Sequence, residues 1–72
     1  MSFDFSKLSG KIREVYGTQE AFANAMGFSE RTLSLKLNNK VSWKTVEAGK
    51  ACELLGLNLD EIPDYFFKVE VQ

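Results

Sequence analysis

The stretch TQEAFANAMGFSERTLSLKLN, residues 18–38, limits the possible fold more than any other part of the chain. Its first half carries three apolar residues at helical spacing, Phe22, Ala23 and Met26. Gly27 interrupts that pattern, and apolar and polar residues then alternate from Leu33 to Leu37, which is typical of a strand. A strand would need a partner strand that the helical neighbourhood does not offer. Leu33 and Leu37 also share one face of a helix, so the sequence favours a short helix over 29–38.

Capping signals precede both short segments. Thr18 can cap the first helix, with Glu20 in its first turn, where the helix dipole favours a carboxylate. Ser29 can cap the second helix in the same way. Two short helices joined by a glycine-containing turn form a helix-turn-helix. In this arrangement Leu35 points away from the buried face, as an ordinary surface leucine or as a contact residue.

The remaining sequence predicts three further helices. A helix over 4–16 buries an apolar face, begins at a cap formed by Asp4 or Ser6, and ends at Gly17. Ser42 can cap a fourth helix, which Gly56 ends.

A fifth, short helix is expected over 59–66, with Pro63 in its first turn. The final residues, 67–72, alternate apolar and polar side chains in the manner of a short strand. We find no repeat and no linker. We therefore expect one domain over 1–72, an all-α, compact five-helix domain with a short C-terminal strand.

Length and composition exclude several classes of function. A chain of 72 residues has a core too small to enclose a deep substrate pocket as well, so we expect a binding module and not an enzyme. It has no His and one Cys, Cys52, which excludes His-based acid–base catalysis, Cys/His zinc sites and an internal disulfide. We expect no catalytic residue, no metal and no cofactor. The chain also lacks a secretion signal and a membrane-spanning apolar run, so we expect it in the cytoplasm.

Charge is distributed unevenly, although the net charge is only −1. Residues 1–50 hold eight of the nine bases, whereas residues 51–72 hold five of the ten acids. Over 31–50 the balance is five bases to one acid. Such a local basic footprint attracts phosphates, and the alternative reading is ordinary surface charge.

Residues 4–62 resemble the Cro and phage-repressor type of helix-turn-helix regulators. The resemblance lies in TQEAFANAMGFSERTLSLKLNNK and in the later segment ACELLGLNLDEI, which is similar to the usual close of the family domain. Two positions depart from the family pattern. Asn39 stands where a glycine is common, and it can supply the left-handed backbone that glycine usually provides. Lys36 stands where an apolar residue is common, which leaves the core of the motif thinner.

The resemblance implies a set of residues that contact double-stranded operator DNA. Four residues of the second motif helix would read bases, namely Glu30, Arg31, Ser34 and Leu35. Arg31 can pair with guanine, Glu30 can accept a hydrogen bond from cytosine, and Leu35 can lie against a thymine methyl. Six residues would contact phosphates: Thr18, Gln19, Asn38, Asn39, Lys40 and Lys44. The alternative for both sets is a solvated helix start with plain turn and surface polarity.

Two functions from different classes remain open. The first is a Cro-like phage transcriptional regulator that binds operator DNA, as a homodimer, in a lysis/lysogeny switch within the bacterial host cell. The second is an antirepressor that binds the phage repressor and controls the repressor's occupancy of DNA. Six aromatic or apolar residues could form a protein interface: Trp43, Val46, Leu54, Phe67, Val69 and Val71. The alternative for these six residues is core filling.

Overall fold

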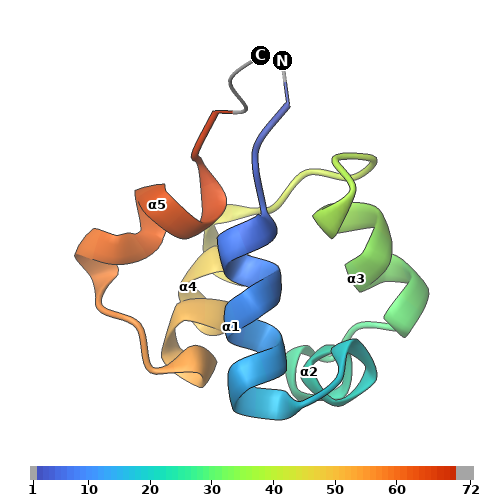
Figure 1. Cartoon of the computed structure of the whole chain (residues 1–72). Coiled ribbons are helices and arrows are strands. Elements are labelled where there is room, and N and C mark those ends of the chain that lie inside the picture. The colour runs from blue at the N-terminus through green and yellow to red at the C-terminus, as the bar shows by residue number, and fades with distance from the viewer. Residues whose placement is uncertain (1, 70–72) are drawn as a thin grey trace.

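Five α-helices and one 3-10 turn make up the described part of the chain, residues 2–69 of this computed structural model. The elements follow in the order α1 (Ser6–Tyr16), α2 (Gln19–Met26), α3 (Glu30–Leu37), α4 (Thr45–Leu55), η1 (Leu59–Glu61) and α5 (Ile62–Phe66). Helix α1 runs through the middle of the molecule, with α2 and α3 on one side of it and α4 and α5 on the other (Figure 1). The expected all-α fold with five helices is confirmed.

One hydrophobic core joins these helices. Its largest fully buried side chains come from all five of them: Phe22, Phe66, Leu8, Ile12, Leu33 and Cys52. Burial raises the pKa of the Cys52 thiol, with smaller contributions from the carboxylates of Glu61 and Asp60. The thiol donates to the Leu57 carbonyl oxygen at 3.2 Å, so it behaves as a buried structural group at the end of α4.

The two short helices predicted over 18–38 are confirmed, together with their caps. The Thr18 hydroxyl accepts a hydrogen bond from the Ala21 N–H at 3.1 Å. Gly27 ends α2 in the left-handed conformation, with φ 81°. The Ser29 hydroxyl then accepts from the backbone N–H three residues later at 3.1 Å, which starts α3. Leu33 is fully buried, so the alternating pattern over 33–37 belongs to a helix.

Helix α4 begins later than the sequence predicts. Ser42 does not cap it. The helix starts at Thr45, and the backbone N–H of Lys44 donates to the Glu47 carboxylate at 2.9 Å, which satisfies a donor at the helix start. Trp43, two residues before this start, is buried in the core, and the backbone of Lys44 that follows it is extended and not helical.

The predicted C-terminal strand over 67–72 is reduced to one antiparallel bridge within the described residues. Val69 lies opposite Phe3, and the Asp4 N–H donates to the Lys68 carbonyl oxygen at 2.7 Å. Residues 68–69 therefore pair with the N-terminal segment, and these two described segments lie side by side (Figure 1). Helix α1 starts at Ser6 and not at residue 4, and the Asp4 carboxylate accepts a hydrogen bond from the Ser6 N–H at 2.9 Å at this start.

The fifth predicted helix forms as two short pieces. A 3-10 turn over Leu59–Glu61 leads into α5, with Pro63 in the first turn of α5 as expected. Among the helices of residues 2–69, none has the length and apolar character needed to cross a membrane.

Candidate binding surface on helix α3

A shallow hollow lies where the outer side of α3 meets the start of α2. We call it the α3 face, and its five lining residues are Gln19, Glu30, Arg31, Ser34 and Leu35. The four residues predicted to read bases thus lie together, beside one residue predicted to contact phosphate. Glu30 and Arg31 are exposed, and the other three are half-buried. The structure places these residues on one surface, and their role in binding stays a prediction.

Two local features hold the α3 face in place. The Ser29 cap starts α3, so the first turn presents Glu30 and Arg31 to solvent. On the opposite side of the same helix, Leu33 anchors α3 in the core. The face therefore offers a guanidinium, a carboxylate, a hydroxyl and an apolar side chain from a rigid helix. Such a set of groups suits polar recognition with some apolar contact.

Three of the six predicted phosphate contacts have polar groups that already bond within the chain. The Thr18 hydroxyl caps α2, and the Asn38 amide donates to the Ser34 carbonyl oxygen at 2.8 Å. The Asn39 amide accepts from the Phe3 N–H and donates to the Phe3 carbonyl oxygen, both at 2.9 Å.

Asn39 has φ 63°, so the predicted left-handed backbone is confirmed. Lys40 and Lys44 are exposed, and Gln19 is half-buried on the α3 face. Those three side chains are the ones best placed to meet a charged partner.

The sequence prediction missed the role of Lys36, which lies in the core and does not thin it. Its side chain is 4 % exposed, and its Nζ donates to Glu47 Oε1 at 2.8 Å and to the Ser42 carbonyl oxygen at 3.0 Å. The same Nζ lies 5.2 Å from the centre of the Phe28 ring and 5.8 Å from that of Trp43. In the sequence, the spacing indicates this burial, because Lys36 follows Leu33 by three residues and shares its buried face.

Glu47 ties Lys36 to the start of α4. Burial alone would raise the pKa of the Glu47 carboxyl, but hydrogen bonds from Lys36 and from the Lys44 N–H outweigh it and hold this pKa below its usual value. The carboxylate therefore stays charged and neutralises one of the five bases of the 31–50 segment.

The six predicted interface residues separate into three groups. Trp43 is 9 % exposed and packs against Phe66 at 5.0 Å between ring centroids, so its ring is part of the core, and its part in a protein interface stays a prediction. Leu54 is half-buried against the same core. Val46 is 83 % exposed, and Phe67 and Val69 are each 43 % exposed, so these three remain on the surface. The sixth, Val71, lies outside the described residues.

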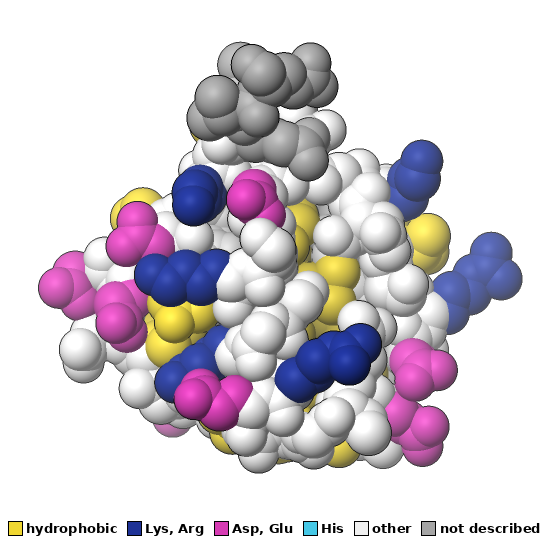
Figure 2. Space-filling model, viewed as in Figure 1, with side chains coloured by type: hydrophobic (Ala, Val, Ile, Leu, Met, Phe, Trp, Pro, Cys, Tyr) yellow, Lys and Arg dark blue, Asp and Glu magenta, His cyan; other side chains and the backbone are white. Residues whose placement is uncertain are grey.

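Charged side chains of both signs lie on both sides of the molecule. On the face drawn in Figure 2, acidic side chains lie at the edge on the side of α5 with basic side chains beside them, and basic and acidic side chains also lie together on the side of α3. The α3 face is thus mixed in sign and not a continuous basic strip.

Residues 2–69 contain no group of three or more His, Cys, Asp or Glu side chains able to hold a metal ion.

Comparison with known proteins gives a family and a solved relative. A family model described as "Protein of unknown function (DUF739)" matches residues 1–69. The solution structure of the modulator of repression (MOR) of the temperate bacteriophage TP901-1 from Lactococcus lactis is similar, with a TM-score of 0.81. The two sequences are 60% identical, and the match covers 97% of each chain.

The match with the phage protein confirms the resemblance to phage regulators that the helix-turn-helix pattern indicated. No curated protein matches the chain. The match to the family model spans residues 1–69, so it includes all five helices and both partners of the terminal bridge, Phe3 and Val69. The chain therefore belongs to the family described as "Protein of unknown function (DUF739)".

Proposed function

We propose that this protein is a regulator of a temperate phage that modulates repression. The observation that carries the proposal is the 60% identity to a phage modulator of repression over 97% of both chains. Identity at this level, spread over the whole length, extends to surface side chains as well as to the core. The role needs no catalysis and no cofactor, and it would be carried out in the cytoplasm of the bacterial host.

The proposed mode of action is binding to the phage repressor protein through the α3 face, which controls how much of the repressor occupies DNA. The charge of this surface supports a protein partner. Arg31 has a carboxylate beside it in the same helical turn, Glu30, and Glu20 is in the first turn of α2. A mixed face of this kind fits another protein better than it fits a uniformly negative phosphate backbone.

The basic segment 31–50 is also weaker than its composition suggests. Lys36 is neutralised by Glu47, and Lys50 donates to the Met26 carbonyl oxygen at 3.3 Å. Arg31, Lys40 and Lys44 remain as exposed cations of this segment, while the exposed Lys50 keeps its charge but holds its ammonium against a backbone carbonyl. Proteins that bind DNA tightly through its backbone make about 6–10 phosphate contacts, so three freely placed cations from this segment give modest affinity for DNA.

Operator binding is the second candidate, and the helix-turn-helix geometry favours it. Ser29 caps α3, and the four predicted base readers lie together on the side of that helix away from the core. A recognition helix that enters the major groove by its N-terminus uses residues at these positions. In this mode the protein would act as a homodimer, with two copies of α3 about 34 Å apart on a two-fold operator.

One experiment separates the two candidates. The purified chain is titrated with the repressor protein of the same phage, and separately with fluorescent fragments of the operator DNA which that repressor binds. We expect a stable complex with the repressor and only weak, salt-sensitive association with DNA. Sequence-specific DNA binding without a repressor complex would favour the second candidate.

The variants Arg31→Ala and Leu35→Ala test whether the α3 face is the contact. Arg13→Ala is the matched control, because Arg13 is an exposed arginine of α1 that does not line the α3 face. We expect both α3 variants to weaken the complex and the control to leave it unchanged. Equal effects from all three substitutions would contradict an interface at α3.

A further inference from the structure

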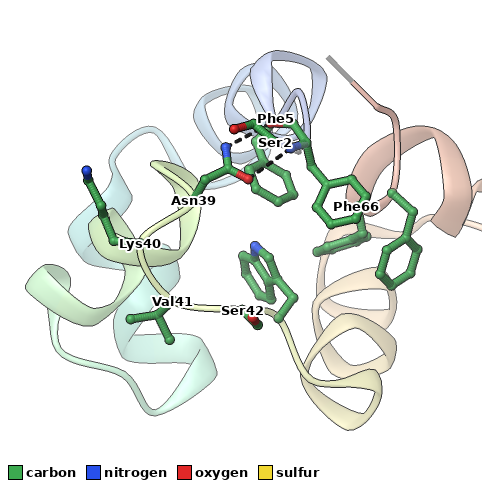
Figure 3. A pocket seen from close by; sticks show the side chains of 10 residues that line it. Ser2, Phe5, Asn39, Lys40, Val41, Ser42 and Phe66 are labelled. Carbon is green, nitrogen blue, oxygen red and sulfur yellow. Dashed lines mark hydrogen bonds between the residues drawn. The ribbon is translucent and has the colours of Figure 1, made fainter.

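A second concave site lies outside the α3 face, where three distant segments of the chain meet. A pocket of about 200 Å³ opens between the N-terminal segment, the loop after α3 and the end of α5 (Figure 3). Five aromatic residues from these segments line it: Phe3, Phe5, Trp43, Phe66 and Phe67. Figure 3 shows Phe5, Asn39 and Phe66 around this space, with the two bonds of the Asn39 amide drawn as dashed lines.

The wall of the pocket contains a polar group without a partner. Trp43 is 9 % exposed, and its indole Nε1 is buried with no hydrogen-bond partner among the described residues. A buried donor of this kind costs free energy until an acceptor reaches it, and buried indole N–H groups usually find one. Trp43 is a lining residue of the pocket, so a ligand inserted there is placed beside its ring.

Two of the lining residues of the pocket are exposed apolar residues, since Val41 is 41 % exposed and Phe67 is 43 % exposed. Val69 does not line the pocket, but it is 43 % exposed and lies opposite the lining residue Phe3 in the terminal bridge. Single exposed apolar residues are ordinary on a protein, whereas several that lie close together mark a contact surface. Phe67 packs edge-on against Phe3 at 5.8 Å and stays half in solvent, so its ring can turn without opening the core.

We propose that this pocket is an anchor site for one apolar side chain of a partner protein, whose adjoining backbone carbonyl accepts a hydrogen bond from Trp43 Nε1. A cavity of about 150 Å³ holds a benzene molecule, so the pocket is large enough for a leucine or phenylalanine side chain. Buried aromatic pockets with an apolar rim are typical anchor points of protein interfaces.

Two observations favour the partner that the α3 face would bind. Asn39 and Lys40 line the pocket and directly follow Asn38, the C-terminal cap of α3, so a protein that covers the end of α3 reaches the pocket. Lys40 is also the only charged residue among the described residues that line it. The inserted segment should therefore carry a carboxylate near its apolar residue. The identity of this partner rests on the proposed function, whereas the binding chemistry of the pocket does not.

The test uses the single tryptophan as a reporter, because only one indole N–H signal exists in the NMR spectrum of the chain. The full chain is titrated with N-acetyl-L-leucinamide, which carries an apolar side chain and carbonyl acceptors. N-methylacetamide, which has the carbonyl without the side chain, is the control. We expect a saturable downfield shift of the indole proton with the first probe only. An unmoved indole signal up to the limit of solubility would overturn the proposal.

The charge of the partner segment is tested with a matched pair of probes. N-acetyl-L-leucine carries a carboxylate, and we expect it to bind severalfold more tightly than the neutral amide. Lys40→Gln should remove this difference, while Lys44→Gln, on an exposed lysine outside the pocket lining, should retain it. Equal binding of both probes to the unaltered chain would overturn the acidic character assigned to the partner.

A chain shortened to end at Val69 tests the alternative occupant, which is the end of this chain itself. Tighter probe binding after shortening, with a shifted indole signal before any probe is added, would identify the chain's own end as the occupant and overturn the proposal. Unchanged binding of the probe supports an external partner.

Measurements of repressor binding connect the pocket to the proposed function. They also show whether the pocket proposal or the α3 face is wrong. Phe67→Ala should weaken repressor binding at least tenfold, whereas Leu59→Ala, on an apolar residue that is 77 % exposed and lies outside the lining, should not. If Phe67→Ala has no effect while Arg31→Ala does, the pocket proposal fails and the α3 face stands. If only Phe67→Ala weakens binding, the α3 face fails and the pocket stands. Thermal unfolding of each variant confirms that it is folded.

Discussion

The α3 face and the aromatic pocket are built in opposite ways. The α3 face comes from one continuous segment, from Gln19 to Leu35, and helix caps define it locally. The pocket draws on Phe3, on Trp43 and on Phe66, which meet only when the whole chain has folded. Local periodicity can reveal the first kind of surface, whereas the second kind depends on contacts between distant segments.

The residue that connects the two surfaces is Lys36. It lies on the inner side of α3, bonds to Glu47 and to the Ser42 carbonyl oxygen, and lies near the Trp43 ring. One buried cation therefore bonds α3 both to the start of α4 and to the loop that leads to the pocket. Substitutions at Lys36 should disturb both surfaces together, and substitutions at either surface should act separately.

Lys36→Ala is the most damaging change that we predict. It removes one partner of a buried ion pair and leaves Glu47 without its charge partner, which typically costs about 3–5 kcal/mol of unfolding free energy. In a domain this small such a loss removes most of the stability. Chemical denaturation followed by circular dichroism would measure it.

Lys36→Met, combined with Glu47→Gln, is the matched control for the ion pair. Replacing a buried pair by well-packed uncharged groups is often neutral or stabilising. We therefore expect the double variant to be more stable than Lys36→Ala alone. If Lys36→Ala were as stable as the unaltered protein, the ion pair would have no structural role.

Leu33→Ala and Leu35→Ala should separate the inner and outer sides of α3. Leu33 is fully buried, so truncation to alanine should cost about 2–5 kcal/mol of unfolding free energy. Leu35 is half-buried on the α3 face, so the same truncation should stay within about 1 kcal/mol. Denaturant titrations of both variants would test this, and similar losses at the two positions would contradict the orientation of the helix.

The features that could be predicted from the sequence are the local ones, and those that could not depend on contacts between distant segments. The caps at Thr18 and Ser29, the glycine stop at Gly27 and the left-handed Asn39 were predictable because each depends on a few neighbouring residues. The five-helix fold followed from those signals, and so did the grouping of the four outward residues of α3.

Long-range contacts explain what the sequence did not reveal. The sequence left Trp43 open between an interface and the core, because its burial depends on Phe5, Phe28 and Phe66, which come from other segments. The alternation at the C-terminus indicated a strand, but its pairing with Phe3 could not be read from either segment alone. The start of α4 also moved from Ser42 to Thr45, and Trp43, two residues before this start, is buried in the core.

Arg31→Ala should affect binding and not stability. Arg31 is exposed at the start of α3, so removing its guanidinium leaves the core intact. We expect a loss of about 1–3 kcal/mol in binding free energy, the range for a well-placed charged contact. Isothermal titration with the repressor would measure this loss. If DNA is the true partner, the same variant should instead relax the preference at one base pair.

The free energy of unfolding should depend on pH through the ionisation of the Glu47 carboxyl. Its pKa in the folded protein lies below the ordinary value of 4.5, so the unfolded chain binds a proton more readily. The stabilisation is therefore present above pH 4.5 and disappears as the pH falls through the lower folded value. Denaturation midpoints measured down this pH range should fall for the unaltered protein. Glu47→Gln should show a shallower fall, and an identical slope would contradict this role of the carboxylate.

The smallest predicted effect concerns Lys40 and Lys44, the two exposed lysines near the loop after α3. If either lysine binds a phosphate, its replacement by alanine should weaken binding to all DNA sequences alike and flatten the salt dependence by about one unit of slope for each phosphate released. If the partner is a protein, the substitutions should change the association rate and its salt dependence while the complex dissociates at nearly the same rate. Lys50→Ala is the control, because the Lys50 ammonium lies on α4 and bonds to the Met26 carbonyl oxygen. Stopped-flow measurements with both partners at two salt concentrations would distinguish these outcomes. A sequence-selective loss of DNA binding after substitution of Lys40 or Lys44 would contradict both of these expectations. The two lysines would then read bases, and the recognition surface would extend beyond α3.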